Sequence, residues 1–386
     1  MLLEETYPSG RMVRNTIGSY GDLTLVETKT TGSSAARASN FTYSAPGAVT
    51  AMQLGNGLWE STVFNKRLQP TAIKLGTTNG GTDRLSLGYT YGTSGTNNGN
   101  ILTQTIAVPS GFTATQTYTY DNLNRIATAA EVISGSTSWS QTFGYDRYGN
   151  RNITAGTGVT NLTFGATTNR ITTTGYSYDA AGNTTADPSG IKGFTYDGEN
   201  KQVLSTGGGW TTGIYEYDGD GKRVRKYGSS TGDNTLFVYN AAGVLVEEYT
   251  LWNNPPTVVT SYVYAGSRLL STETASGINY LTADHLGSPR ISTNGSASVV
   301  ARHDYMPFGE EITSSITSQR TTGLGYQSDG VRKQFTGYER DGESGLDFAQ
   351  ARYYVNAHGR FSSADPLMAS ASPLNPQSFN RYSYVL

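Results

Sequence analysis

The sequence predicts an all-β protein, and three observations carry that prediction. The chain of 386 residues contains 47 glycines and 27 tyrosines, with serine and threonine throughout and few helix formers. Tyrosine and threonine fit a pleated, half-buried surface, and frequent glycine marks turns. A Tyr-Asp pair also recurs with a turn formula behind it, as in GYSYDAAGNTT from Gly175 to Thr185.

The Tyr-Asp pairs form a repeat. They are Tyr120-Asp121, Tyr145-Asp146, Tyr178-Asp179, Tyr196-Asp197 and Tyr217-Asp218, with a Tyr239-Asn240 variant. Successive tyrosines are separated by 25, 33, 18, 21 and 22 residues. A recurring unit of this size is typical of a structural repeat that stacks on its neighbours.

Each repeat predicts one β-hairpin. Alternating residues such as Phe143 and Tyr145 predict the incoming strand, and the residues after the turn predict the outgoing one. Aspartate caps the turn, while glycine or asparagine accepts a positive φ. We expect each tyrosine ring to stack on that of the next hairpin, with its hydroxyl bound to water or backbone. Because a short hairpin cannot bury one face alone, the hairpins are expected to join into one continuous sheet.

Composition excludes several classes of function. A net charge of −2 argues against bulk nucleic-acid binding, which requires many cations. The sequence has no cysteine, so neither disulfides nor thiolate metal sites are expected, and three scattered histidines show no metal-ligand spacing. No stretch has the length of a membrane span, and we expect no signal peptide at Met1. We expect no cofactor.

The repeats resemble the tyrosine-aspartate repeats of the RHS (rearrangement hotspot) family, which includes insecticidal toxin-complex C subunits and teneurins. Later segments strengthen the resemblance because they follow the order of the family's repeat-associated core. These segments are YLTADHLGSPR from Tyr280, DYMPFGE from Asp304, FTGYERD from Phe335, ARYY from Ala351 and GRFSSADP from Gly359.

The resemblance implies a strip of hairpins that spirals into a hollow shell, with the core segment inside as a plug. It also implies a bacterial protein, secreted or at the cell surface, that encloses a C-terminal toxin or effector polypeptide in cis. A secretion apparatus and cell-surface glycans are further partners to consider. The chain is expected to be a fragment, truncated at its N-terminus and before a later D-P-x-G motif of the family.

We expect residues 1–263 to form the YD-repeat strip, with an irregular connection at Pro255 and Pro256, and residues 264–386 to form the core segment. The Ser/Thr/Gly-rich stretch from Glu310 to Gln334 is expected to be a mobile excursion between core motifs. No split into independent domains is expected, because the strip is one sheet.

Asp365, in Asp365-Pro366, and Arg352 are the candidate catalytic residues. Two carboxylates that share a proton can activate water and polarise a scissile carbonyl. The family resemblance assigns this autoproteolytic role to Asp365 and to a second aspartate in the later motif, with Arg352 compensating the charge. Relatives usually carry glycine where this chain has Met368. The alternative is that Asp365 caps a turn and Arg352 forms a structural ion pair.

Three other polar groups have simpler interpretations. His285, near Ser288, is expected to contact an aspartate in a turn rather than to catalyse. Glu310 and Glu311 are adjacent on an extended chain, so their side chains point to opposite faces and cannot act as a carboxylate pair. The basic cluster from Lys222 to Lys226 is expected to solvate a strand edge.

Three functions therefore stay open. The first is a structural shell that encloses a cargo polypeptide. The second is a cell-surface adhesion or carbohydrate-binding protein that stacks exposed tyrosines on sugars. The third is an aspartyl autoprotease that is active only in the full-length parent.

Overall fold

The computed structural model describes residues 3–30, 32, 34–93, 95–367, 372 and 376–384. Within these residues the protein is built from β-strands and short 3-10 helices. The all-β prediction is confirmed. Met368 lies outside the described residues.

The first sheet contains thirteen antiparallel strands in sequence order, so every strand pairs with its neighbours along the chain. The strands are β1 (Glu4–Thr6), β2 (Met12–Ile17), β3 (Leu23–Lys29), β4 (Ser34–Tyr43), β5 (Val49–Leu54), β6 (Trp59–Phe64), β7 (Pro70–Gly76), β8 (Leu85–Thr90), β9 (Thr103–Ala107), β10 (Thr113–Tyr120), β11 (Ile126–Ile133), β12 (Ser136–Tyr145) and β13 (Arg151–Gly156).

The second sheet repeats this arrangement with thirteen further antiparallel strands. They are β14 (Ser177–Tyr178), β15 (Thr184–Asp187), β16 (Lys192–Tyr196), β17 (Gln202–Gly207), β18 (Trp210–Tyr217), β19 (Arg223–Gly228), β20 (Asp233–Tyr239), β21 (Leu245–Thr250), β22 (Thr257–Ala265), β23 (Arg268–Thr274), β24 (Gly277–Ala283), β25 (Pro289–Asn294) and β26 (Val299–Arg302).

The strip is interrupted once. Residues 157–176 join the two sheets, and within them only Phe164 forms a β-bridge, to Ile171. The expectation of one continuous sheet is therefore wrong at this point. The boundary predicted at 263 and 264 falls within β22, and strand order continues to β26. The division into strip and core segment stays a prediction.

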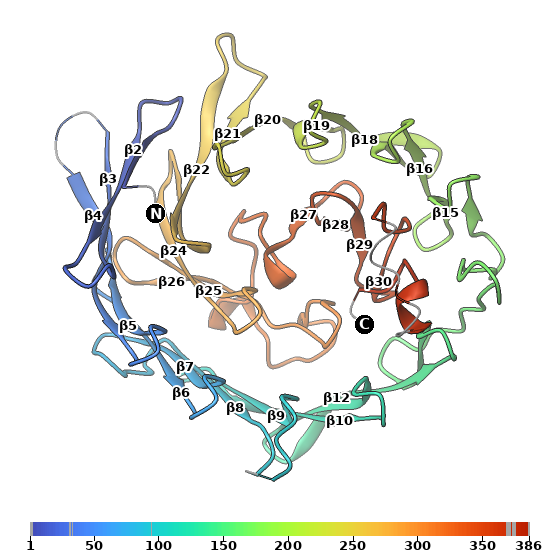
Figure 1. Ribbon diagram of the computed structural model, residues 1–386, viewed down its shortest axis with the longest axis horizontal. Helices are drawn as coiled ribbons and strands as arrows, with labels where there is room; N and C mark the ends of the chain where they lie inside the picture. Colours follow the sequence, from blue (N-terminus) through green and yellow to red (C-terminus); the bar gives the residue numbers. More distant parts are fainter. Residues whose placement is uncertain are drawn as a thin grey trace.

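The chain after β26, from His303 to Tyr384, forms the inner segment. Its described residues form a four-stranded antiparallel sheet and short 3-10 helices: β27 (Glu339–Asp341), β28 (Leu346–Phe348), β29 (Tyr353–Val355), β30 (Arg360–Phe361), η1 (Thr322–Leu324), η2 (Phe335–Gly337) and η4 (Pro376–Phe379). The two large sheets curve around this segment as a wall, and β27–β30 lie inside the ring (Figure 1).

The two ends of the wall overlap. Strands β22–β26 lie on the inner side of the first sheet (Figure 1), where Val263, Leu270 and Ile291 join Val26 and Leu87 in one buried apolar cluster. Glu273 of β23 also pairs with Arg11, in the β1–β2 turn, and with Arg37 of β4. We call this contact the overlap seam. Within the described residues neither sheet closes by strand pairing, so packing of faces holds the spiral together.

The predicted turns share one backbone geometry. Asp121 Oδ1 accepts hydrogen bonds from the N–H groups of Leu123 (2.8 Å) and Arg125 (3.0 Å), and Asn124 has a φ of 60°. The same pair of bonds recurs at Asp146, Asp197, Asp218, Asn240, Asp284 and Asn294, and Asp179 accepts one from Asn183. The predicted role of the aspartate as turn cap is confirmed.

The tyrosines of the repeats bind the main chain of the preceding repeat. Tyr145 donates its hydroxyl hydrogen to the carbonyl oxygen of Ile126 (2.8 Å), six positions after Tyr120. Three more tyrosines use the same offset: Tyr217 binds Gln202, Tyr239 binds Arg223 and Tyr264 binds Leu245. Tyr120 binds Ile101 across a longer loop. Next to the interruption at residues 157–176, the hydroxyl of Tyr178 accepts a hydrogen bond from the N–H of Ile171. The hydroxyl of Tyr196 donates a hydrogen bond to Ser362 of the inner segment.

The ring faces are covered by cations. The guanidinium carbon of Arg125 lies 4.3 Å from the centroid of the Tyr145 ring, and Lys201 and Lys222 lie over Tyr217 and Tyr239. Across the described residues, the ring contacts do not join tyrosines of consecutive YD pairs. The predicted ring-on-ring stacking is therefore wrong, and in these three repeats the basic residue before the outgoing strand covers the next ring instead.

Candidate functional site

The wall holds the inner segment through buried charges, and this contact is the strongest candidate for a functional site. Arg223 and Lys226 project from β19, and both side chains are fully buried. Arg223 pairs with Asp341 and, at 3.1 Å, with Glu339. Lys226 lies 3.0 Å from Glu343. We call the contact between β18–β21 and the inner segment the inner seam.

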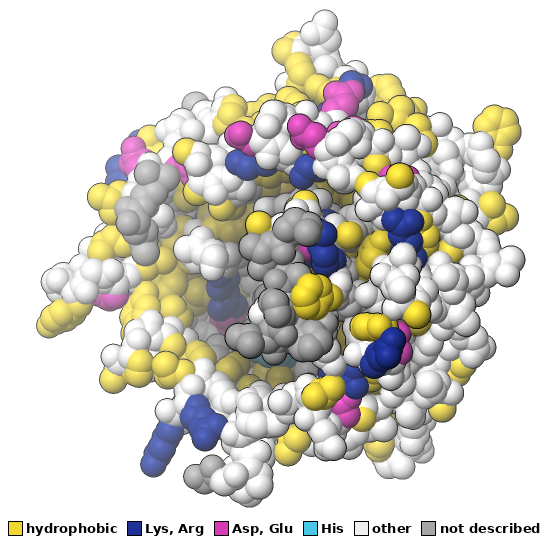
Figure 2. All heavy atoms as spheres, turned by 45° about the vertical axis from the view of Figure 1, so that its right-hand side comes forward, with side chains coloured by type: hydrophobic (Ala, Val, Ile, Leu, Met, Phe, Trp, Pro, Cys, Tyr) yellow, Lys and Arg dark blue, Asp and Glu magenta, His cyan; other side chains and the backbone are white. Residues whose placement is uncertain are grey.

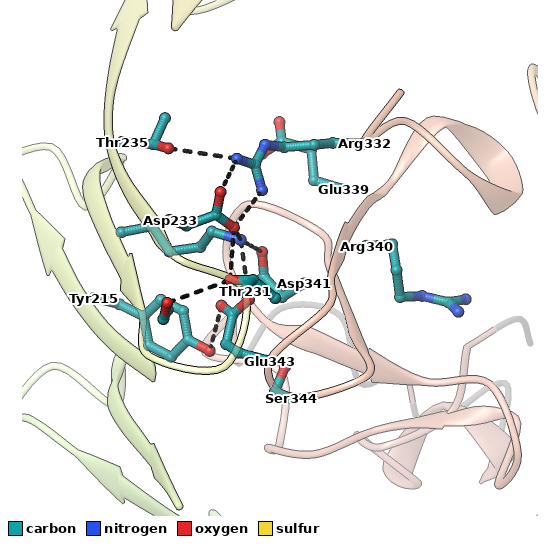
Figure 3. Close-up of polar contacts among 12 residues, drawn as sticks. Tyr215, Thr231, Asp233, Thr235, Arg332, Glu339, Arg340, Asp341, Glu343 and Ser344 are labelled. Carbon is teal, nitrogen blue, oxygen red and sulfur yellow. Dashed lines mark hydrogen bonds and ion pairs between the residues drawn. The ribbon is translucent and has the colours of Figure 1, made fainter. Parts of the chain in front are cut away.

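Hydrogen bonds complete the inner seam. The hydroxyl of Tyr215 in β18 donates a hydrogen bond to Glu343 (3.0 Å). Asp233 of β20 forms an ion pair with Arg332 of the inner segment at 3.0 Å. Figure 3 shows these groups pointing toward one another from the wall and from the inner segment. Burial alone would raise the pKa of Asp233, but the Arg332 side chain holds it well below its ordinary value. Burial and the neighbouring Asp341 raise the pKa of Glu343.

A second charged network ties together both sheets and the inner segment. Arg320 binds both carboxylate oxygens of Glu131 in β11, at 2.8 and 2.7 Å, and Asp304 at 2.8 Å. Asp304 also pairs with Arg290 of β25. All four side chains are buried. Burial alone would raise the pKa of Asp304, yet Arg290 and Arg320 hold it far below its usual range.

The asparagine of the Gly-Asn formula also contributes to this attachment. Asn150 donates to its own turn residue Asp146 and to Asn169, each at 2.8 Å. Its amide oxygen accepts from Asn380 (2.8 Å) and Arg360 (3.3 Å) of the inner segment. This explains why the repeat places asparagine after glycine: its amide bonds both its own turn and a neighbouring segment.

The predicted catalytic pair lies together at the edge of a cavity. Arg352 Nη2 is 3.4 Å from Asp365 Oδ2, and the guanidinium also lies over the Phe361 ring at 3.7 Å. Asp365 Oδ1 accepts a hydrogen bond from the N–H of Leu367 (2.9 Å), as a turn cap does. A cavity of about 410 Å³ beside them is also lined by the turn residues Asn200 and Asp220. Burial lowers the pKa of Arg352, and Asp365 opposes that effect.

The contact predicted for His285 differs from the one in the structure, whereas Glu310 and Glu311 point apart as predicted. His285 packs edge-on against the Tyr89 ring, with centroids 4.8 Å apart, rather than bonding to Asp284. Glu311 binds His303 Nδ1 at 2.7 Å, whereas Glu310 is half-buried and its Oε2 is enclosed elsewhere, as their opposite directions predict. Within the described residues, no cluster of three potential metal ligands occurs and no helix has the length and apolarity to cross a membrane.

Two expectations about charge and mobility are wrong. The basic cluster from Lys222 to Lys226 does not solvate a strand edge, because β19 pairs on both sides and Arg223 and Lys226 face inward. The stretch from Glu310 to Gln334 is anchored by Arg320 and by Ile312, which is 1% exposed. Sequence reasoning missed these residues because their partners are far away in the chain.

Comparisons with known proteins agree with the geometry. A family model described as Teneurin YD-shell matches residues 28–385. The tRNA3(Ser)-specific nuclease WapA of Bacillus spizizenii is 28% identical over 232 residues, which cover 58% of this chain and 9% of that protein. Salivary gland surface protein 1 of Aedes aegypti is 30% identical over 168 residues, 41% of this chain and 5% of that protein.

Solved structures of toxin complexes share the fold. A Photorhabdus luminescens Tc holotoxin pore with a TccC3 variant matches all of this chain and 20% of that chain, with a TM-score of 0.74 and 18% identity. TcdB2-TccC3 without its hypervariable C-terminal region matches 95% of this chain and 20% of that chain, with a TM-score of 0.71 and 18% identity. The chain thus spans less than a tenth of these curated relatives and a fifth of these solved chains.

Proposed function

Because this chain belongs to the teneurin YD-shell family, and its fold has a shell-type structural role, we propose that it forms part of a container for a polypeptide cargo. The cargo would be a toxin or effector that follows in the same longer chain, at or outside the bacterial surface. The observation that carries this proposal is the inner segment, which is fixed to the inner face of a curved wall by buried charges (Figures 1 and 3).

Three further features support containment. Figure 2 shows a hollow on one face, with hydrophobic side chains in its depth. The overlap seam locks the two ends of the wall against each other. The proteins named above include a nuclease and toxin complexes, and one solved complex is described as lacking a hypervariable C-terminal region.

A protease-protection assay tests containment. An unstructured reporter polypeptide is fused after Leu386, and its digestion by a limiting protease is timed. We expect slower digestion than for the same reporter added as a free polypeptide. The control carries the reporter on an exposed hairpin, between Gly208 and Gly209 of the β17–β18 turn. Equal digestion of the C-terminal, hairpin and free reporters would overturn containment.

Autoproteolysis by the full-length parent is a second proposal, and the placement of Asp365 beside Arg352 at a cavity favours it. The parent is expected to cut itself after the core segment, and Asp365→Asn is expected to abolish the new band on a gel. Asp220→Asn, which changes another carboxylate at the same cavity, is the matched control. Continued cleavage by Asp365→Asn would contradict the proposal.

Carbohydrate adhesion through the repeat tyrosines has less support. Tyr145, Tyr217 and Tyr239 use their hydroxyls on backbone carbonyls and carry cations over their rings. Stacking on a sugar would require those ring faces to be free. Glycan-array binding that survives Tyr145→Phe but disappears on Tyr145→Leu would restore the adhesion hypothesis.

A further inference from the structure

A pocket lies where turns of the wall meet the inner segment. Its volume is about 330 Å³, at the lower end of the range for ligand pockets. Tyr145 and Tyr148 line it from the wall, and Phe308, Phe335 and Tyr384 line it from the inner segment. Aromatic rings therefore line the pocket from both sides, and it is separate from the cavity beside Asp365.

Arg151 places a buried cation in this pocket. It begins β13, directly after a YD turn, and is 6% exposed. The guanidinium carbon lies 3.9 Å from the centroid of the Phe308 ring. The backbone of Gly359 is close as well, since a Cβ there would lie 2.7 Å from Nε of Arg151.

The guanidinium has unused hydrogen-bonding capacity. Nη2 of Arg151 donates to the carbonyl oxygen of Ala357 (3.1 Å), but Nε and Nη1 are buried and have no hydrogen-bond partner among the described residues. Arg125 also lines the pocket, and its Nη1 is likewise buried without a hydrogen-bond partner among the described residues. Buried donors without partners are rare in native proteins and call for an explanation.

The surrounding charges do not supply that explanation. Arg125 pairs with Asp121 through Nη2 at 2.7 Å, which leaves its Nη1 free. Glu310 is near enough for Arg151 to lower its pKa, although burial raises that pKa more strongly. Within the described residues, Arg151 forms no ion pair at 4 Å or less. A buried cation without a close carboxylate is costly, and an anionic ligand would remove that cost.

We propose that this pocket binds a carboxylate that carries an apolar group. The carboxylate oxygens would accept from Arg151 and Arg125, since guanidinium and carboxylate form strong, charge-assisted hydrogen bonds. The apolar group would lie against Phe308, Phe335 and Tyr384. Two sources offer this chemistry: the terminal carboxylate of a polypeptide with an apolar last residue, and a small free carboxylic acid. The inference does not rest on containment.

Calorimetric titration with matched probes tests the ligand class. The probes are N-acetyl-L-phenylalanine, the same compound as an amide, an acetylated tripeptide that ends in phenylalanine, and 3-phenylpropionate. We expect the carboxylates to bind at least about tenfold more tightly than the amide, the usual effect of losing a charged hydrogen bond. Tighter binding of the tripeptide assigns a polypeptide terminus, and tighter binding of 3-phenylpropionate assigns a small acid. Equal affinity of acid and amide would overturn the proposal.

Variants and labelling test the location. Arg151→Met should weaken binding of N-acetyl-L-phenylalanine at least about tenfold, while Arg14→Met, at an exposed arginine outside the pocket, should not change it. If Arg151→Met fails to fold, the unchanged protein is photolabelled with N-acetyl-4-azido-L-phenylalanine. Label in peptides containing Tyr145, Tyr148 or Phe308, displaced by the unlabelled acid, supports the site. Label confined to other peptides overturns it.

Discussion

The overlap seam is mainly apolar, with ion pairs around Glu273, whereas the inner seam is built mainly from buried charges. In the overlap seam Leu87 and Ile106 pack with Val263 and Ile291, all fully buried. In the inner seam Arg223 and Lys226 meet the carboxylates of the inner segment. Apolar side chains can pack against one another in many arrangements. A buried charge is stable only in an arrangement that places an opposite charge beside it. The overlap seam thus supplies adhesion between faces, and the inner seam fixes where the inner segment sits.

The largest effect should come from breaking the inner seam on one side. Arg223→Met leaves Asp341 and Glu339 buried without that cation, which should cost about 4 kcal/mol of the free energy of unfolding. Urea unfolding measures the loss. Arg225→Met, two residues away and paired with the exposed Glu216, is the control and should cost less than about 1 kcal/mol. Equal losses for the two variants would show that the buried ion pairs of the inner seam contribute no more than an exposed one.

A cavity in the overlap seam should have the next largest effect. Leu87 is fully buried, so Leu87→Ala should cost about 3 kcal/mol through lost burial and an unfilled cavity. Val63→Ala, on the same sheet but 47% exposed, should cost well under half as much. The measurement is again urea unfolding. A change of less than about 1 kcal/mol for Leu87→Ala would show that the seam repacks freely.

Raising the pH should weaken the attachment at His303. Its Nδ1 lies 2.7 Å from Glu311 and its Nε2 3.7 Å from Asp329. Burial alone would lower its pKa, but the two carboxylates raise it from 6.5 to about 9. Because the folded pKa exceeds the unfolded one, this stabilisation is complete below pH 6.5 and is lost as pH rises through about 9.

We therefore expect the free energy of unfolding to fall by up to about 3 kcal/mol more in the wild type than in His303→Gln between those pH values. Unfolding curves collected at intervals of pH give the two slopes. Parallel slopes would show that His303 does not titrate in this range.

The smallest effect should come from one turn. Asp121→Ala removes two acceptor contacts to backbone N–H groups and the ion pair with Arg125, and should cost about 1 kcal/mol, as loss of a cap does. Asp220→Ala, at an exposed turn position, should have almost no effect on stability and serves as the control. Thermal unfolding compares them. A loss as large as that of Arg223→Met would mean that turns, rather than seams, dominate the stability.

The turns could be predicted because their chemistry is local. Asp121 binds N–H groups two and four residues ahead, and Asn124 accepts the positive φ, so one short stretch holds the whole interaction. The order of the strands followed from the repeat. The placement of Asp365 near Arg352 followed from a resemblance, and the distance confirms only that they meet.

The buried charges could not be predicted for two physical reasons. Arg223 pairs with a carboxylate 118 residues away, and Arg320 with one 189 residues away, so neither pattern is visible locally. In addition, β18 and β19 shift register between Glu216 and Tyr217, which places a bulge at the start of β19. A bulge breaks the alternation of faces, so Arg223 and Lys226 can share one side although their spacing is odd.

The bond from each tyrosine to the preceding repeat has an evolutionary consequence. Tyr145 recognises a carbonyl oxygen of Ile126, a group that every amino acid carries. A duplicated or deleted hairpin would therefore meet a compatible neighbour whatever side chains that neighbour bears. Copy number alone could then set the circumference of the molecule, and genes of this kind could lengthen or recombine without matched substitutions on both sides of each new junction.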